Sequence, residues 1–177
     1  MRKVTLFVFM AVCLILSIPV TAEPNPKKYD VFLEAEHYAA TNGFAKDSRD
    51  RTPSGETVAN LWKLSEPEEE GYWAKWEFDI ASTGSYWLVI WLQDITKNIT
   101  SPFWIQVDDQ GWIHCTKNTI QKFEGAYTMD MAGYIIDQFP LKAGKHTLRL
   151  KVDERRGYKD QAYNLIFDCL AFTKKKP

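Results

Sequence analysis

Short apolar stretches alternate with polar turns along this chain, and the pattern predicts a protein built from β-strands. The clearest period of two spans residues 72–80, which have one apolar face and one mostly polar face, as in a strand with one buried side. The apolar face holds Tyr72, Ala74, Trp76, Phe78 and Ile80, and the other holds Trp73, Lys75, Glu77 and Asp79. Residues 86–92 are apolar on both faces, which predicts a central strand.

Several further strands are predicted, at residues 29–36, 103–108, 112–115, 134–141, 146–152 and 165–172. The long polar stretch 41–56 contains Gly43, Pro53 and Gly55, and we expect it to be a loop. No segment longer than about twelve residues has a helical period. The predicted fold is therefore all-β, an antiparallel β-sandwich in a single domain.

The first residues have the pattern of a secretory signal peptide. Arg2 and Lys3 precede an apolar run at 6–18, and Val20-Thr21-Ala22 supplies small residues before a cleavage site after Ala22. The run is too short for a stable membrane span. We therefore expect a signal peptide at 1–22, a polar leader at 23–28, a β-sandwich at 29–173 and a basic tail at 174–177, in a secreted, periplasmic or cell-surface protein.

Net charge limits the class of partner that we expect, and the cysteines allow two redox states. The whole chain has a formal charge of −1, and without Arg2 and Lys3 of the signal peptide the remainder has a charge of −3. A nucleic-acid binder needs a basic face, so we expect no nucleic-acid partner. Export permits a disulfide between Cys115 and Cys169, but a free thiol is equally typical of Cys169 in its apolar strand. Both states of the cysteines stay open.

Catalytic motifs are missing from the sequence. It lacks a Gly-x-Ser-x-Gly nucleophile elbow, a phosphate-binding glycine loop and a zinc-binding His-x-x-x-His pair. The three histidines are isolated among strand residues, where a packed or surface role is typical. We therefore predict that the chain is not an enzyme.

Acidic residues near both ends of the domain suggest a cation site. Glu34 and Glu36 are two residues apart, so on a strand they point to the same face. If the first and last strands lie side by side, Asp168 joins them at one oxygen-rich corner, which suits calcium. A solvated strand face is the alternative explanation of the glutamates.

Aromatic residues supply the other candidate chemistry, with seven tryptophans and eight tyrosines. Their rings stack on the apolar faces of sugars while their edges form hydrogen bonds. Trp73 and Trp104 alternate with the core residues of their strands, and further aromatic residues lie in or beside predicted loops: Trp62, Trp112, Tyr127, Tyr158 and Tyr163. The pattern favours a sugar-binding protein, and the alternative is that the rings fill the core.

An ordered set of short segments matches a known group. The set comprises Glu34-Ala35-Glu36-His37, Trp76 to Ile80 with the following Ala81 to Leu88, Ser101 to Asp109, Leu141 to Leu150, Asp153 to Gly157, and Phe167 to Leu170. Together the segments resemble the galactose-binding-like jelly roll of carbohydrate-binding module families 6 and 35. The likeness covers nearly all of residues 29–173.

The resemblance implies a β-sandwich with a structural calcium held by Glu34, Glu36 and Asp168, and a glycan partner bound by loop aromatics. Family members often have an asparagine close to the last aspartate, but here Ile166 stands at that place and Asn164 is the nearest asparagine. The candidate sugar-binding residues are Trp73, Trp104, Trp112, Tyr127, Tyr158, Tyr163 and Asn164. The predicted function is an exported, non-catalytic carbohydrate-binding domain. The alternative is a protein-interaction or cell-envelope structural sandwich that has lost sugar binding.

Overall fold

The structure is a computed structural model that describes residues 26–49, 52–55, 57–123 and 131–177. The predicted signal peptide at 1–22, the first part of the leader and Tyr127 lie outside the described residues. Within the described ranges, none of the helices has the length and apolar character needed to cross a membrane.

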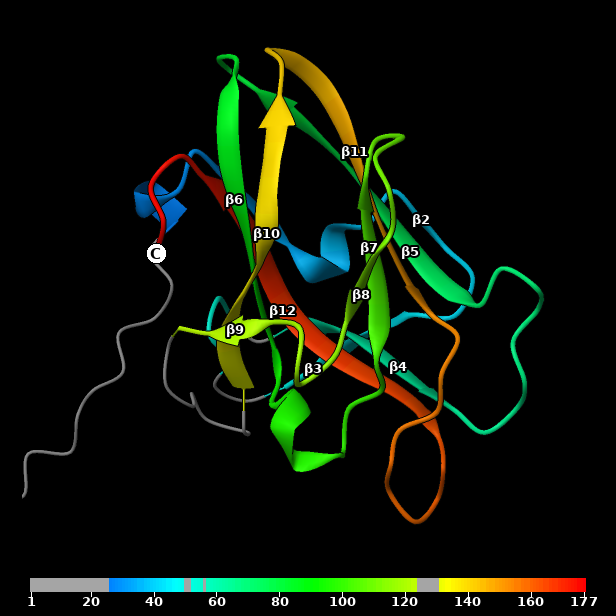
Figure 1. Cartoon of the computed structure of the whole chain (residues 1–177). Helices are drawn as coiled ribbons and strands as arrows, with labels where there is room; N and C mark the ends of the chain where they lie inside the picture. The colour runs from blue at the N-terminus through cyan, green and yellow to red at the C-terminus, as the bar shows by residue number, and fades with distance from the viewer. Residues whose placement is uncertain (1–25, 50–51, 56, 124–130) are drawn as a thin grey trace, which may run out of the picture.

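The described chain folds into two antiparallel β-sheets that face each other, as the alternation of apolar and polar residues predicts (Figure 1). The larger sheet has the order β3 (Ala45–Ser48), β4 (Thr57–Lys63), β12 (Tyr163–Thr173), β6 (Gly84–Gln93), β10 (Met131–Leu141) and β9 (Gln121–Lys122), and β1 (Val31–Glu34) also pairs with β12. The smaller sheet has the order β2 (Ala40–Thr41), β5 (Tyr72–Ile80), β11 (Gly144–Val152), β7 (Phe103–Val107) and β8 (Ile113–Cys115). Three short 3₁₀ turns complete the described elements: η1 (Pro26–Lys28), η2 (Ala35–His37) and η3 (Ile95–Lys97).

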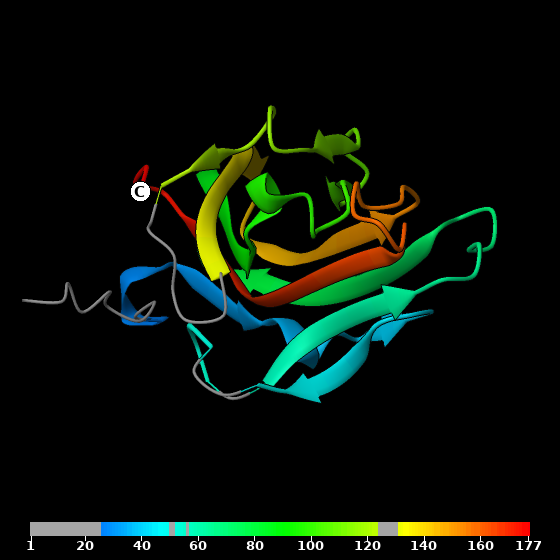
Figure 2. The same cartoon turned by 90° about the horizontal axis from the view of Figure 1, so that it is seen from below.

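Strand β12 is the centre of the seven-stranded sheet. Along one edge it pairs first with β4 and then with β1, and along the other edge it pairs with β6. Figure 2 shows β12 running through the middle of the molecule with the first strand beside it. The opening and closing strands are therefore neighbours, as the sequence predicts.

The main core fills the space between the sheets. Trp76 lies at its centre with only 1% of its surface exposed, and its ring packs edge-on against Phe167 at 5.3 Å between centroids. The indole Nε1 donates a hydrogen bond to the carbonyl oxygen of Ala35 at 3.1 Å. A core residue thus fixes the position of η2, which carries Glu36.

A second apolar cluster covers the outer face of the seven-stranded sheet, and it explains why residues 86–92 are apolar on both sides. Its buried members are Val89, Trp91, Met131, Ile135, Cys169 and Ala171. Cys115 belongs to the main core between the sheets, whereas Cys169 belongs to this outer cluster. Both cysteines are free and buried, so the structure resolves the open question in favour of thiols.

Two expectations about the first part of the chain were wrong. The predicted loop 41–56 contains the end of β2 and all of β3, whose residues are mostly exposed at a sheet edge and therefore lack an apolar period. The predicted strand 29–36 ends at Glu34, and Glu36 lies in η2. Glu34 and Glu36 therefore do not share one strand face. Strand β4 was not predicted, because two adjacent residues, Val58 and Ala59, are both buried and break the alternation.

Candidate functional site

Residues from β1, η2, β12 and one loop gather at the acidic corner, which we define as Glu34, Glu36, Asp168 and Ser54. Glu34 is paired in register with Cys169, the neighbour of Asp168. Ser54 joins the two strands, because its backbone N–H donates to Asp168 Oδ2 at 2.7 Å and its hydroxyl donates to Glu34 Oε2. Asp168 Oδ1 and Glu36 Oε2 are buried and have no hydrogen-bond partner among the described residues.

The acidic corner is electrostatically unfavourable for its own carboxylates. Burial raises the pKa of Asp168, and hydrogen bonds from Thr52 and Ser54 only partly offset the effect. Burial also raises the pKa of Glu34; the Ser54 hydroxyl opposes the shift, whereas the charges of Glu36 and Asp168 add to it. As the side chains stand, no group of three His, Cys, Asp or Glu in the described ranges is arranged to hold a metal ion.

Three of the predicted tryptophans lie together on the outer face of the five-stranded sheet, which we call the tryptophan face. In register across the sheet, Trp73 of β5 stands opposite Lys151 of β11, and Lys151 stands opposite Trp104 of β7. Trp104 in turn stands opposite His114 of β8. Trp112 comes two residues before His114, so it reaches the same face.

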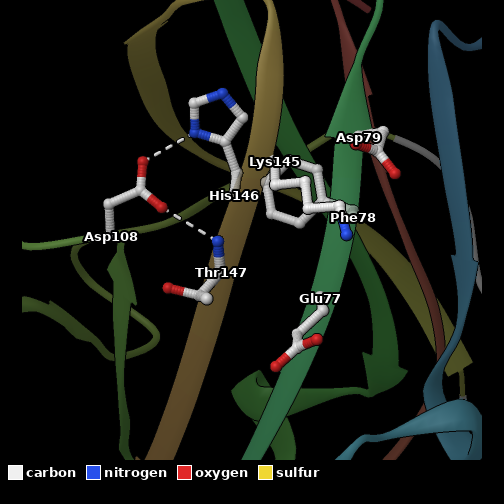
Figure 3. A pocket seen from close by; sticks show the side chains of 7 residues that line it. All are labelled: Glu77, Phe78, Asp79, Asp108, Lys145, His146 and Thr147. Atoms are coloured by element: carbon white, nitrogen blue, oxygen red, sulfur yellow. Dashed lines mark hydrogen bonds and ion pairs between the residues drawn. The ribbon is translucent and has the colours of Figure 1, made fainter.

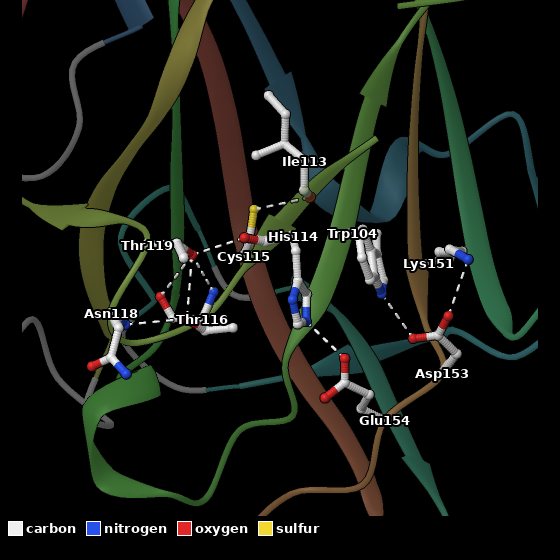
Figure 4. A network of polar contacts seen from close by, with 10 residues as sticks. All are labelled: Trp104, Ile113, His114, Cys115, Thr116, Asn118, Thr119, Lys151, Asp153 and Glu154. Carbon is white, nitrogen blue, oxygen red and sulfur yellow. Dashed lines mark hydrogen bonds and ion pairs between the residues drawn. The ribbon is translucent and has the colours of Figure 1, made fainter. Parts of the chain in front are cut away.

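Trp104 is held rigidly within the tryptophan face (Figure 4). Its ring is stacked on His114 with centroids 4.1 Å apart and planes 12° from parallel. Its indole Nε1 donates to Asp153 Oδ1 at 2.9 Å, and Asp153 Oδ2 pairs with Lys151 Nζ at 3.0 Å. His114 Nε2 lies 2.7 Å from Glu154 Oε1. Trp104 therefore supports the face, with one ring side already occupied by His114.

Trp73 and Trp112 line an open pocket of about 200 Å³ on the tryptophan face, together with Glu70, Arg149 and Lys151. The Arg149 Cζ lies 5.6 Å from the Trp112 ring centroid, and Lys151 Nζ lies 5.3 Å from it. The sequence alternation placed Arg149 and Lys151 outward but did not mark them as site residues. Only the register of β5, β11 and β7 places Lys151 between Trp73 and Trp104, with Arg149 two residues away on the same face.

The other candidate sugar-binding residues lie elsewhere. Tyr158 is 49% exposed in the loop before β12, beside the Arg156 guanidinium. Tyr163 is buried and donates its hydroxyl to Glu66. Asn164 is buried too, and its Nδ2 donates to the carbonyl oxygen of Ile99 at 2.7 Å. We leave Tyr163 and Asn164 out of the candidate site because internal partners occupy their polar atoms, and Tyr127 because it is not described.

A separate pocket of about 380 Å³ lies at the far end of β5 and β11 (Figure 3). There His146 Nδ1 lies 2.7 Å from Asp108 Oδ2, and Nε2 lies 2.8 Å from the carbonyl oxygen of Lys142. Burial alone lowers the pKa of His146, but these two acceptors and the charges of Asp108 and Asp79 outweigh burial and raise the pKa. Both ring nitrogens of His146 face acceptors, so both hydrogen bonds form when the imidazole is protonated. In that state the side chain links the turn at Asp108 to the turn at Lys142.

Comparison with known proteins supports the fold. No protein-family model matches the sequence, and no curated protein sequence matches it either. Among solved structures, a family 35 carbohydrate-binding module from Clostridium thermocellum is similar, with a TM-score of 0.57 and 15% identity, over 80% of this chain and 97% of that one. A β-1,3-glucan binding CBM6 from Bacillus halodurans is similar with a TM-score of 0.51 and 13% identity, over 82% of this chain and 96% of that one.

Larger proteins contain the same fold as one part. The GH26-CBM35 β-(1,4)-mannanase of Podospora anserina matches with a TM-score of 0.54 and 17% identity over 85% of this chain, which spans only 28% of the mannanase. The predicted resemblance to carbohydrate-binding module families 6 and 35 is therefore confirmed for the fold.

Proposed function

We propose that this chain is an exported, non-catalytic carbohydrate-binding domain whose glycan site is the tryptophan face. The observation that carries the proposal is the pocket formed by Trp73 and Trp112 beside the fixed ring of Trp104. Aromatic rings stack on the apolar faces of sugars, and nearby polar side chains orient the hydroxyl groups. The modules with the same fold support this use of the chain, and the signal-peptide pattern at 1–22 supports export.

The geometry suits an extended glycan. Trp73 and Trp104 stand two strands apart, which is roughly 10 Å from the spacing of strands in a sheet. The pocket that Trp73 and Trp112 line is open to solvent. A short stretch of polysaccharide fits such a surface better than a single sugar does, because each ring contributes a separate contact.

We expect Trp73→Ala and Trp112→Ala to weaken glycan binding by at least about tenfold each, because each removes a stacking surface. Binding is measured by screening a broad glycan array and titrating the best ligand by calorimetry. Trp62→Ala is the matched control, since Trp62 is 51% exposed on β4 in the other sheet.

The control variant should bind as the unchanged protein does. Equal losses in all three variants would place the site elsewhere, and no binding to any glycan would favour the protein-interaction or cell-envelope alternative. Far-ultraviolet circular dichroism and the melting temperature of each variant establish that it is folded.

We also propose that calcium binds at the acidic corner, held by Glu34, Glu36 and Asp168. Three observations support the assignment: carboxylates are the ligands calcium prefers, two buried oxygens there have no hydrogen-bond partner among the described residues, and burial raises the pKa of both Glu34 and Asp168. Bound calcium would supply positive charge that offsets the repulsion between these groups. Its role would be stability, because an ion that binds only the folded state favours folding.

Calcium is therefore expected to raise the melting temperature, and a chelator should reverse the effect. With millimolar calcium and a dissociation constant about a hundredfold lower, the gain in the free energy of unfolding is about 3 kcal/mol. Asp168→Asn should abolish the calcium-dependent shift. The control Glu77→Gln changes a mostly exposed carboxylate on β5 and should keep the shift. A melting temperature that does not depend on calcium in the unchanged protein would contradict the assignment.

A further inference from the structure

Five exposed lysines gather where the start of β1 meets the end of β12, and we call this group the lysine patch. It comprises Lys27 and Lys28 of η1 and the three residues after β12, Lys174, Lys175 and Lys176. Strands β1 and β12 are antiparallel with Val31 opposite Phe172, so the residues before β1 lie beside those that follow β12 (Figure 1). The strand pairing thus joins two basic segments that are far apart in the sequence.

The lysine patch is a local excess of positive charge. The backbone N–H of Asp30 donates to the carbonyl oxygen of Phe172 at 3.0 Å, and the backbone N–H of Lys174 donates to Asp30 Oδ2 at 2.9 Å. Lys174 Nζ donates to the Ser82 hydroxyl at 2.7 Å, which is a neutral partner. Among the described residues, no carboxylate lies within ion-pair distance of four of these lysines, Lys28, Lys174, Lys175 and Lys176.

Aromatic rings lie beside the lysine patch. A pocket of about 370 Å³ is lined by aromatic and basic side chains, among them Lys28, Tyr29, Phe123, Lys175 and Lys176. Tyr29 and Phe123 both pack edge-on against Trp91, with ring centroids 5.4 Å and 5.7 Å away. Lys176 Nζ lies 4.9 Å from the centroid of the Trp87 ring. The pocket therefore combines cationic side chains with rings that the outer apolar cluster holds in place.

This combination suits the surface of an anionic bilayer. Each lysine close to such a surface strengthens binding by about fivefold through its attraction to the negative headgroups. Partly buried aromatic rings are favourable at the boundary between headgroups and acyl chains, and long lysine side chains keep their charge in the water above. A soluble polyanion would use the lysines alone and would leave the rings without a role.

We propose that the lysine patch, together with Tyr29, Trp87 and Phe123, docks this protein on a membrane surface that contains anionic phospholipids. The three rings pack against the apolar cluster on the outer face of the seven-stranded sheet. The tryptophan face is the outer face of the five-stranded sheet, so docking leaves it free. The proposal does not depend on what the tryptophan face binds.

The form to test is residues 23–177, which lacks the predicted signal peptide and contains every described element. Binding is measured by co-flotation with vesicles of phosphatidylcholine alone and with vesicles of equal parts phosphatidylcholine and phosphatidylglycerol. We expect at least about tenfold tighter binding to the anionic vesicles at low salt, and loss of this difference in about 0.5 M salt, which screens the charges. Equal binding to both vesicles, or binding to neither, would contradict the proposal.

The double variant Lys175→Gln/Lys176→Gln should weaken binding to the anionic vesicles by at least about tenfold, because it removes two charges of the patch. The matched control is Lys63→Gln/Lys159→Gln. Both of its lysines are exposed, and they lie at the opposite end of β12, where Lys63 is paired with Tyr163. The control should bind as the unchanged protein does. Equal losses in the two double variants would assign the effect to net charge and overturn the role of the patch.

Trp87→Ala distinguishes a bilayer from a soluble polyanion. It should weaken binding to the anionic vesicles by about fivefold and leave binding to soluble polyphosphate unchanged, whereas the exposed Trp62→Ala should change neither. Polyphosphate that binds as tightly as the anionic vesicles, with no loss of vesicle binding in Trp87→Ala, would identify a soluble polyanion and overturn docking on a bilayer. The melting temperature shows whether Trp87→Ala is folded, and the lysine variants test the same surface without touching a packed ring.

Discussion

Trp76→Ala is expected to lower the free energy of unfolding by about 4 kcal/mol. Trp76 is 1% exposed and packs against Phe167 at the centre of the core, so truncation leaves a large cavity between the sheets. It also removes the hydrogen bond from the indole Nε1 to the carbonyl oxygen of Ala35. Urea denaturation followed by circular dichroism measures the loss.

Two further variants separate the contribution of core packing from that of the hydrogen bond to Ala35. Trp76→Phe keeps a buried ring but loses the bond to Ala35, and we expect a cost of about 1–2 kcal/mol. Because that bond holds η2, Trp76→Phe should also reduce the melting shift caused by calcium. Trp62→Ala, an exposed tryptophan, should change stability by less than about 1 kcal/mol. A similar cost for Trp62→Ala and Trp76→Ala would contradict the described core.

Asp94→Ala is expected to cost about 3 kcal/mol, because Asp94 is a buried anion that three side chains share. Its Oδ1 accepts hydrogen bonds from the Tyr134 hydroxyl at 2.7 Å and from the Thr96 hydroxyl at 2.6 Å. Its Oδ2 lies 2.9 Å from Lys122 Nζ. Removing the carboxylate leaves the buried Tyr134 hydroxyl without its acceptor. It also removes the ion pair by which Lys122 of β9 contacts the start of η3. Asp109→Ala, in an exposed turn, is the control and should change stability by less than about 0.5 kcal/mol.

The effect of Asp94 also has a defined pH dependence. Burial alone would raise the pKa of Asp94, but hydrogen bonds from Thr96, Lys122 and Tyr134 outweigh burial and hold the pKa well below its usual value. The stabilisation is therefore complete above about pH 4, the value of an unfolded aspartate, and is lost as pH falls toward the folded pKa. The difference between the unchanged protein and Asp94→Asn should be largest at neutral pH and should shrink in acid. A difference that does not vary between pH 7 and pH 3 would contradict this account.

The sequence predicts the strands well where one face of a strand is buried and the other is exposed to solvent. Residues 72–80 form a strand with the predicted bounds, and the predicted strand 103–108 forms as far as Val107, because the side chains of both alternate between core and solvent. Alternation does not predict β3, where both faces are largely exposed, or η2, where a 3₁₀ turn replaces the end of a strand. Alternation contains no signal for either case.

The candidate site was only partly predictable. Alternation indicated that Trp73 and Trp104 point outward, but it could not show that Lys151 stands between them, since register across β5, β11 and β7 depends on the whole sheet. Arg149 had the pattern of an ordinary solvated residue for the same reason. Conversely, Tyr163 and Asn164 lie beside a loop in sequence, yet the strand that follows begins early and buries both.

The central place of β12 has a consequence for the order of events during synthesis. This strand of 11 residues is the partner of β1, β4 and β6, and it is the last strand of the described chain to be made. The larger sheet therefore cannot be completed during synthesis before β12 is made, because β1, β4 and β6 all pair with that strand. Long-range pairing of this kind makes folding slow and leaves β1, β4 and β6 without their shared partner until β12 emerges. An incompletely folded chain of this kind is one that can be threaded through a translocation pore.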